Sequence, residues 1–91
     1  MIRVVIADDE EHVCRLIQSL VDWEKLDMEI AGIAHNGVEA LELTKKLSPD
    51  LMITDIRMPG YDGLKMIKLA KSFNKNLDFI IISGYCHFEY A

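Results

Sequence analysis

The sequence lacks a long hydrophobic run and has few cysteines. Its apolar stretches are far shorter than the ~20 residues that a membrane-spanning helix requires, so we expect no membrane-embedded segment. Cys14 and Cys86 are far apart and form no C-x-x-C pair. Because Met1 leads directly into an apolar strand-like run rather than a signal peptide, these features predict a protein of the reducing cytoplasm.

Proline and glycine are also scarce, with two and five copies in 91 residues. This excludes collagen-like and proline-rich disordered chains, and 51% hydrophobic with 27% charged residues is typical of a folded globular protein. The length allows one domain at most, residues 1–91.

Positive charge is in the minority. The formal net charge is -5, and the ten Lys and Arg residues are dispersed along the sequence. Binding to a phosphate backbone requires clustered basic residues, so the composition argues against a direct nucleic-acid role. Any DNA binding would therefore lie outside these residues.

Apolar patterning predicts strands that alternate with helices. Short β-branched runs indicate strands, and apolar residues at three- and four-residue spacing indicate helices. Asn36 with Glu39 three residues later is a variant of the capping box, and Pro49 ends the helix that follows it. The predicted strands are 2–7, 28–34, 51–54 and 77–82, the predicted helices are 10–21, 36–47 and 64–73, and 87–91 begins another helix.

This order predicts an α/β fold with a doubly wound parallel sheet and right-handed crossovers. In such sheets, ligands bind beyond the carboxyl ends of the strands. The residues that follow the predicted strands there are Asp8, Asp9, Asp55 and Ser83.

Three carboxylates at one edge of a sheet repel one another unless a cation neutralises them, and oxygen ligands of this kind suit Mg²⁺. An aspartate beside Mg²⁺ is a candidate phosphoryl acceptor, and Ser83 can then donate to a phosphoryl oxygen. Each residue also has a purely structural interpretation. Asp8 and Asp9 can cap a helix, and Asp55 and Ser83 can be ordinary turn residues.

Three segments resemble the receiver domains of two-component response regulators. They are Val5-Ile6-Ala7-Asp8-Asp9-Glu10, Asp55-Ile56-Arg57-Met58-Pro59-Gly60-Tyr61-Asp62-Gly63 and Ile81-Ile82-Ser83-Gly84-Tyr85. The resemblance implies a flavodoxin-like receiver fold with strand order 2-1-3-4. It also implies that Asp55 accepts a phosphoryl group from a sensor histidine kinase.

The same resemblance implies the roles of the other site residues. Asp9 would bind Mg²⁺ directly, Asp8 mostly through water, and the Arg57 backbone carbonyl would be a third oxygen on the metal. Ser83 would be the hydroxyl that follows the phosphate during switching, and Arg57 and Tyr85 would tune the phosphate lifetime. Val21-Asp22-Trp23 and the ending from Ser83-Gly84-Tyr85 to Phe88-Glu89-Tyr90-Ala91 also resemble the subgroup with an AraC-type helix-turn-helix output domain.

The sequence departs from the family pattern at its end, since a complete receiver has a fifth strand ending in a lysine and a fifth helix. We therefore expect a C-terminally incomplete receiver in which Asp55 accepts phosphate weakly or not at all. The fourth predicted strand would be an exposed apolar edge that favours a homodimer or strand exchange.

Two other functions remain open. One is a receiver-like interaction scaffold without phosphorylation, which the missing lysine keeps open. The other is a hydrolase with an aspartyl-phosphate intermediate, which needs two aspartates separated by one residue after one strand, whereas Asp8 and Asp9 are adjacent. The leading prediction is a phosphoacceptor switch that is not a turnover enzyme.

Overall fold

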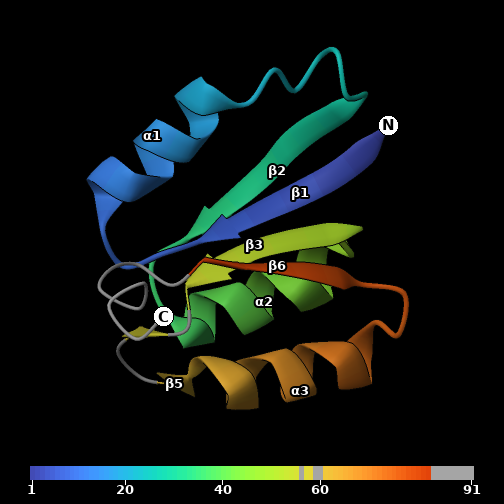
Figure 1. Cartoon of the computed structure of the whole chain (residues 1–91). Coiled ribbons are helices and arrows are strands. Elements are labelled where there is room, and N and C mark those ends of the chain that lie inside the picture. Colours follow the sequence, from blue (N-terminus) through green and yellow to red (C-terminus); the bar gives the residue numbers. More distant parts are fainter. Residues whose placement is uncertain (56, 59–60, 83–91) are drawn as a thin grey trace, which may run out of the picture.

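The computed structural model describes residues 1–55, 57–58 and 61–82. Strands β1 (Ile2–Ala7), β2 (Met28–Ala34), β3 (Leu51–Asp55) and β6 (Asp78–Ile82) form one parallel sheet in the order β2-β1-β3-β6 (Figure 1). The predicted doubly wound α/β fold and the 2-1-3-4 order are confirmed.

Side chains on β1 alternate between two apolar clusters, one on each face of the sheet. Val4 and Ile6 pack with Cys14 of α1 (Glu11–Leu20). Val5 and Ala7 belong to the cluster that includes residues of α2 (Gly37–Leu47) and α3 (Gly63–Phe73). Figure 1 shows α1 on one side of the sheet and α2 with α3 on the other. β1 is apolar on both faces because helices cover both.

The parallel register aligns the carboxyl ends of neighbouring strands. Ala7 at the end of β1 pairs with Thr54 of β3 and with Ala34 of β2. Asp8 is therefore held beside Asp55, although the two residues are far apart in sequence. The register of the parallel strands therefore determines where the site lies.

The segment after β3 differs from the prediction. The sequence predicts an irregular loop over 57–63, whereas β4 (Arg57–Met58) and β5 (Tyr61–Asp62) form a small antiparallel pair. The pair was not readable from the sequence because strands of two residues have too little periodicity to distinguish them from a loop. The helix predicted to begin at His87 lies outside the described residues.

The ends of α2 follow its sequence signals. The Asn36 side chain accepts a hydrogen bond from the Glu39 backbone N–H at 2.8 Å, which confirms the predicted cap. Ser48 takes the left-handed conformation (φ 45°) after Leu47, directly before Pro49. Proline disfavours helical conformation in the residue before it, so the helix ends there. In the part of the chain that the structure describes, no helix is long and apolar enough to span a membrane.

Candidate metal and phosphoryl-acceptor site

Three carboxylates meet at the carboxyl edge of the sheet. Asp8 and Asp9 follow β1, and Asp55 is the last residue of β3. One carboxylate oxygen from each residue lies within 4.8 Å of the others. The structure thus brings together the three acidic residues that the sequence predicts, and a single cation can contact all three.

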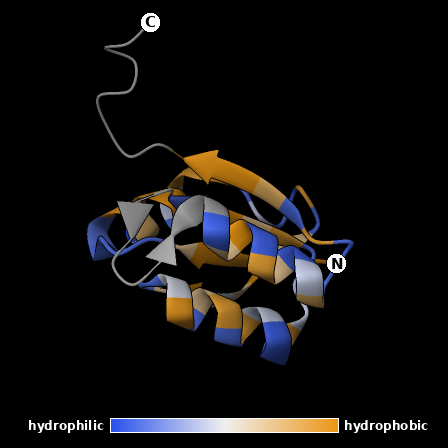
Figure 2. Cartoon of the chain, turned by 90° about the horizontal axis from the view of Figure 1, so that it is seen from below, coloured by the Kyte–Doolittle hydropathy of each residue, from blue (hydrophilic) through white to orange (hydrophobic). Residues whose placement is uncertain are grey.

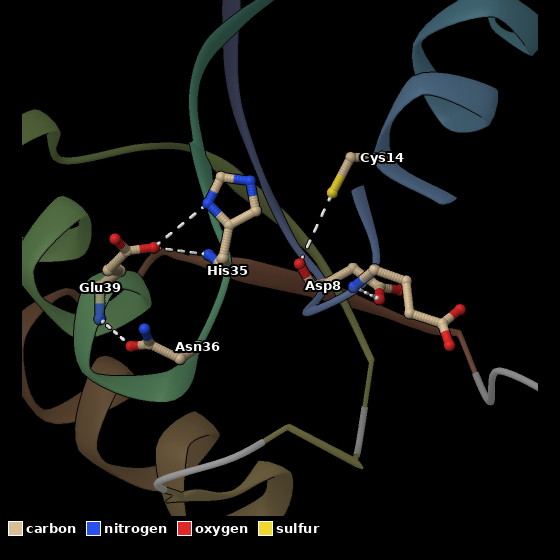
Figure 3. A network of polar contacts seen from close by, with 6 residues as sticks. Asp8, Cys14, His35, Asn36 and Glu39 are labelled. Atoms are coloured by element: carbon tan, nitrogen blue, oxygen red, sulfur yellow. Dashed lines mark hydrogen bonds and ion pairs between the residues drawn. The ribbon is translucent and has the colours of Figure 1, made fainter. Parts of the chain in front are cut away.

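Asp8 is fixed by its backbone and by its side chain. Its N–H donates to the Ala34 carbonyl oxygen at 2.9 Å, and its Oδ1 accepts from the Glu10 N–H at 2.9 Å (Figure 3). Asp8 is only 2% exposed. Burial raises the pKa of its carboxyl, the Glu10 N–H opposes that shift, and the charges of Asp55 and Asp9 add to it.

Asp9 and Asp55 complete the site in different ways. Asp9 is exposed, whereas Asp55 is 9% exposed at the end of a buried strand. The Thr54 hydroxyl donates to the Asp55 backbone carbonyl at 3.0 Å, which helps to fix the end of β3. The site is therefore open to solvent beside Asp9 and closed around Asp8.

The chemistry of this group fits a divalent cation. The three carboxylates concentrate negative charge at one place, and burial together with the charges of Asp55 and Asp9 raises the pKa of Asp8. A hard cation with oxygen ligands relieves this repulsion. The described residues thus form a group that can hold a metal ion.

The structure describes only one of the three other predicted site residues. The Arg57 backbone lies in β4 and pairs with Asp62, so it follows Asp55 closely along the chain. Ser83 and Tyr85 lie outside the described residues. The roles assigned to these three residues stay predictions.

Sequence reasoning missed a polar network beside Asp8, at the end of β2. The His35 N–H donates to Glu39 Oε1 at 2.7 Å, and His35 Nδ1 lies 3.4 Å from the same oxygen (Figure 3). Glu39 therefore reaches the residue before the helix cap, instead of the N–H of Asn36 that the usual capping box uses. The Asn36–Glu39 spacing in the sequence indicated the helix cap. It did not indicate that the Glu39 side chain would also bind His35.

The fold and the acidic edge define an α/β receiver-type domain, and a family comparison agrees. Residues 4–91 match the response regulator receiver domain family. The chain belongs to this family. It is 38% identical over 91 residues to the uncharacterized transcriptional regulatory protein YesN of Bacillus subtilis, covering 100% of this chain and 25% of that protein.

Solved structures give the same result. The receiver (REC) domain of AraT, a response regulator from Geobacillus stearothermophilus, is 39% identical, with a TM-score of 0.88 over 97% of this chain and 68% of that one. A two-component transcriptional regulator, AraC from Clostridium phytofermentans, is 28% identical, with a TM-score of 0.87 over 99% and 70%. The resemblance to receivers of AraC-type regulators is thus supported.

A third structure includes ligands of interest. A chain of the CheX–CheY–BeF3–Mg²⁺ complex from Borrelia burgdorferi is 27% identical, with a TM-score of 0.81 over 92% of this chain and 63% of that one. The chain spans only about a quarter to a third of the length of the first curated relatives, 25% and 35%. Their activities as whole proteins are therefore not transferred directly to it.

Proposed function

We propose that this chain is the phosphoacceptor switch of a two-component response regulator, with Asp55 accepting a phosphoryl group from a sensor histidine kinase. The observation that carries the proposal is the register of β1 against β3, which places Asp8 and Asp9 beside Asp55 at the carboxyl edge. A turn-residue role for Asp55 would not require two further carboxylates within 4.8 Å.

The proposed transfer is a displacement at phosphorus. A carboxylate oxygen of Asp55 forms the new O–P bond while the N–P bond of the kinase's phosphohistidine breaks, and the released imidazole nitrogen takes a proton. The end of β3 holds Asp55 in place, and the open side near Asp9 admits the donor. Each transfer leaves the phosphoryl group on Asp55, so the domain acts as a switch and not as a turnover enzyme.

We assign the metal to Mg²⁺ because the ligands are carboxylate oxygens on an open site that leaves room for water. Asp9 and Asp55 would hold it directly, Asp8 mostly through water, and the Arg57 carbonyl would supply a third protein oxygen. When bound, Mg²⁺ offsets the charge of the incoming phosphate. The BeF3 and Mg²⁺ in the related CheY complex support this assignment.

The switching step is assigned to residues around the site. Ser83 would donate its hydroxyl to a phosphoryl oxygen, and Arg57 and Tyr85 would set the lifetime of the phosphate. Movement of Ser83 would then shift the population of surfaces that contact partners or an output domain. This assignment rests on the motif positions in the sequence.

The proposed setting is a cytoplasmic transcriptional regulator with an AraC-type output domain that binds DNA. The names of YesN and of the Clostridium regulator support it. In the described residues, β6 lies at an outer edge of the sheet with Ile80 50% and Ile81 44% exposed. This apolar edge supports the proposal that another strand, from a homodimer partner or an exchanged segment, pairs with β6.

Intact mass spectrometry tests the phosphoacceptor role. The full-length protein is incubated with a small phosphodonor, with and without Mg²⁺, beside Asp55→Asn and the matched control Asp78→Asn. Asp78 is an exposed residue at the start of β6 and lies outside the acidic group. We expect a Mg²⁺-dependent phosphoryl adduct in the wild type and in Asp78→Asn, and none in Asp55→Asn.

The competing function makes the opposite prediction. A phosphorylation-independent scaffold would give no adduct that depends on Asp55, whatever the Mg²⁺ concentration. An adduct that persists in Asp55→Asn would place the acceptor elsewhere. Either result would overturn the proposal.

A further inference from the structure

A short series of hydrogen bonds connects Glu39 of α2 to Asp8 of the acidic site. The Asp8 N–H donates to the Ala34 carbonyl oxygen at 2.9 Å. The His35 N–H donates to Glu39 Oε1 at 2.7 Å (Figure 3). Because the Ala34 carbonyl and the His35 N–H belong to the same peptide unit, that unit is held at both ends. We call these contacts the Glu39 relay.

The relay supports the last backbone contact between β1 and β2. The register of the two strands ends where Ala7 pairs with Ala34, and beyond this point β1 leads to α1 and β2 leads to α2. A hydrogen bond at the end of a strand pair opens more readily than bonds inside the sheet, because neighbouring bonds hold it from one side only. A second partner on the same peptide unit opposes that opening.

The Glu39 carboxylate is well suited to this role. A hydrogen bond to a charged group is shorter and stronger than one to a neutral group, and linked bonds polarise one another. The carboxylate therefore strengthens the Ala34 carbonyl as the acceptor for Asp8. The Glu39 side chain is 48% exposed, so water screens its charge and the short hydrogen bond transmits most of the effect.

Glu39 is also carried by a firmly packed element. It lies in the first turn of α2, and its own N–H donates to Asn36 Oδ1 at 2.8 Å. The next two residues, Ala40 and Leu41, belong to the apolar cluster that includes Val5 and Ala7 of β1. A side chain on a packed helix holds its partner more precisely than one on a loop.

Helix capping alone does not account for the contact. In the usual capping box the glutamate returns to the N–H of the cap residue, which here would be Asn36. Glu39 instead accepts from His35, one residue earlier, and that N–H shares its peptide unit with the carbonyl that binds Asp8. The His35 imidazole approaches the same oxygen, with Nδ1 at 3.4 Å, which is longer than the backbone contact.

We propose that Glu39 is a positioning residue for the acidic site. Its carboxylate acts through the peptide unit of Ala34 and His35 and holds Asp8 at the geometry in which the acidic site binds a cation. The inference rests on the proposed function, because it takes the acidic site to be a Mg²⁺ site. Glu39 is not one of the three carboxylates that can contact the cation, so its replacement weakens the site without removing a ligand.

Three substitutions of Glu39 separate its charge from its reach. Glu39→Gln keeps the length and an acceptor oxygen and loses the charge. Glu39→Asp keeps the charge on a side chain that is shorter by one methylene group. Glu39→Ala removes both the charge and the acceptor.

Two controls separate the relay from the stability of α2. Glu42→Gln removes the same charge from an exposed position on the same helix. Figure 2 shows hydrophobic and hydrophilic residues alternating along the helices seen from below, as expected for helices with one packed and one exposed face. Asn36→Ala removes the helix cap and retains the Glu39 carboxylate, so it reports on the loss of helix stability.

Two measurements on the full-length protein give the readout. Hydrogen exchange of the Asp8 and His35 amides is followed by NMR in metal-free protein that is isotope-labelled at aspartate and histidine, and Mg²⁺ alone is titrated by calorimetry. We expect both amides to exchange at least about tenfold faster in Glu39→Ala than in Glu42→Gln. We also expect Mg²⁺ to bind Glu39→Ala about tenfold more weakly, as is typical when a residue that orients a metal ligand is lost. Glu39→Gln and Glu39→Asp should lie between Glu39→Ala and the wild type in both measurements.

Three results would overturn the inference. One is Mg²⁺ binding by Glu39→Ala that is as tight as binding by Glu42→Gln. Another is weaker binding with unchanged exchange at Asp8, because charge alone would then explain the effect. The third is equal weakening in Asn36→Ala, which would assign the effect to the stability of α2. A wild type that binds no Mg²⁺ would overturn the proposed metal site together with this inference, so the two failures are distinguishable.

Discussion

The Cys14 thiol donates a hydrogen bond to the backbone carbonyl oxygen of Asp8, with 3.7 Å between sulfur and oxygen (Figure 3). Cys14 lies in the first turn of α1 and is 1% exposed, so the contact links the helix to the acidic site. Asp8 is thereby held by Ala34 at its N–H, by Cys14 at its carbonyl and by Glu10 at its carboxylate.

The environment of Cys14 predicts slow thiol chemistry in the folded state. Burial raises the pKa of the Cys14 thiol, and the Asp8 carboxylate adds to the shift, so the thiolate is scarce near neutral pH. In a Cys86→Ser background, iodoacetamide labelling at about pH 8 should be at least about tenfold slower in native protein than in urea-unfolded protein. Mass spectrometry follows the reaction, and equal rates in the two states would contradict the burial.

Asp8 should destabilise the metal-free protein at neutral pH. Its folded pKa is raised by burial and by neighbouring carboxylates, so its contribution to stability is greatest below the unfolded pKa and is lost as pH rises through the folded pKa. We expect Asp8→Asn to increase the free energy of unfolding by about 1 kcal/mol in EDTA at about pH 7. Urea titration measures the change.

Mg²⁺ should reduce the stability advantage of Asp8→Asn over the wild type. Metal binding stabilises the folded wild type by mass action, and the neutral amide that Asp8→Asn introduces cannot replace a carboxylate charge near the ion. In excess Mg²⁺ we expect Asp8→Asn to gain less stability from the metal than the wild type does. A variant that gains as much as the wild type would show that Asp8 takes no part in metal binding.

The Asn36 cap should contribute measurably to α2. Its side chain satisfies the Glu39 N–H at 2.8 Å, which has no partner within the helix. Asn36→Ala should lower the free energy of unfolding by about 1 kcal/mol, whereas the exposed α2 control Glu42→Ala should change it by less than about 0.5 kcal/mol. Equal losses in thermal unfolding would argue against the cap.

Gly32 leaves room for the packing of α2 on β2. A Cβ atom at this position would lie 3.0 Å from Leu47 Cδ1 and 3.2 Å from Leu43 Cδ1. Both neighbours are the ends of flexible side chains, so we expect Gly32→Ala to cost only about 1 kcal/mol through displaced leucines. The double variant Gly32→Ala with Leu47→Val should lose less free energy of unfolding than the two single variants lose together. Strict additivity of the losses in urea unfolding would rule out the contact.

The sequence predicted the order of the main elements closely because local periodicity carries that information. β1 and β2 have the predicted bounds, and α1 begins one residue later than predicted because Glu10 has an extended conformation. The β4–β5 pair was not predicted, since two-residue strands have too little periodicity to read.

The candidate site was predicted as a set of residues, because carboxylates that follow parallel strands must meet at one edge. Its electrostatics were not predictable. Asp8 and Asp9 are adjacent in the sequence, yet Asp8 is buried with a raised pKa and Asp9 is exposed. That difference arises from the Ala34, Glu10 and Cys14 contacts, which involve separate segments of the chain.

By itself, the sequence determined the strand and helix pattern, the acidic residues at the strand ends and the resemblance to receiver domains, because these depend on local spacing and residue type. The tertiary structure decided which of these residues meet. The register of Ala7 against Thr54 places Asp8 beside Asp55, and the packing of α2 on α3 brings Lys45 onto Phe73. Such contacts depend on how distant segments fill a shared core, and no local pattern encodes that geometry.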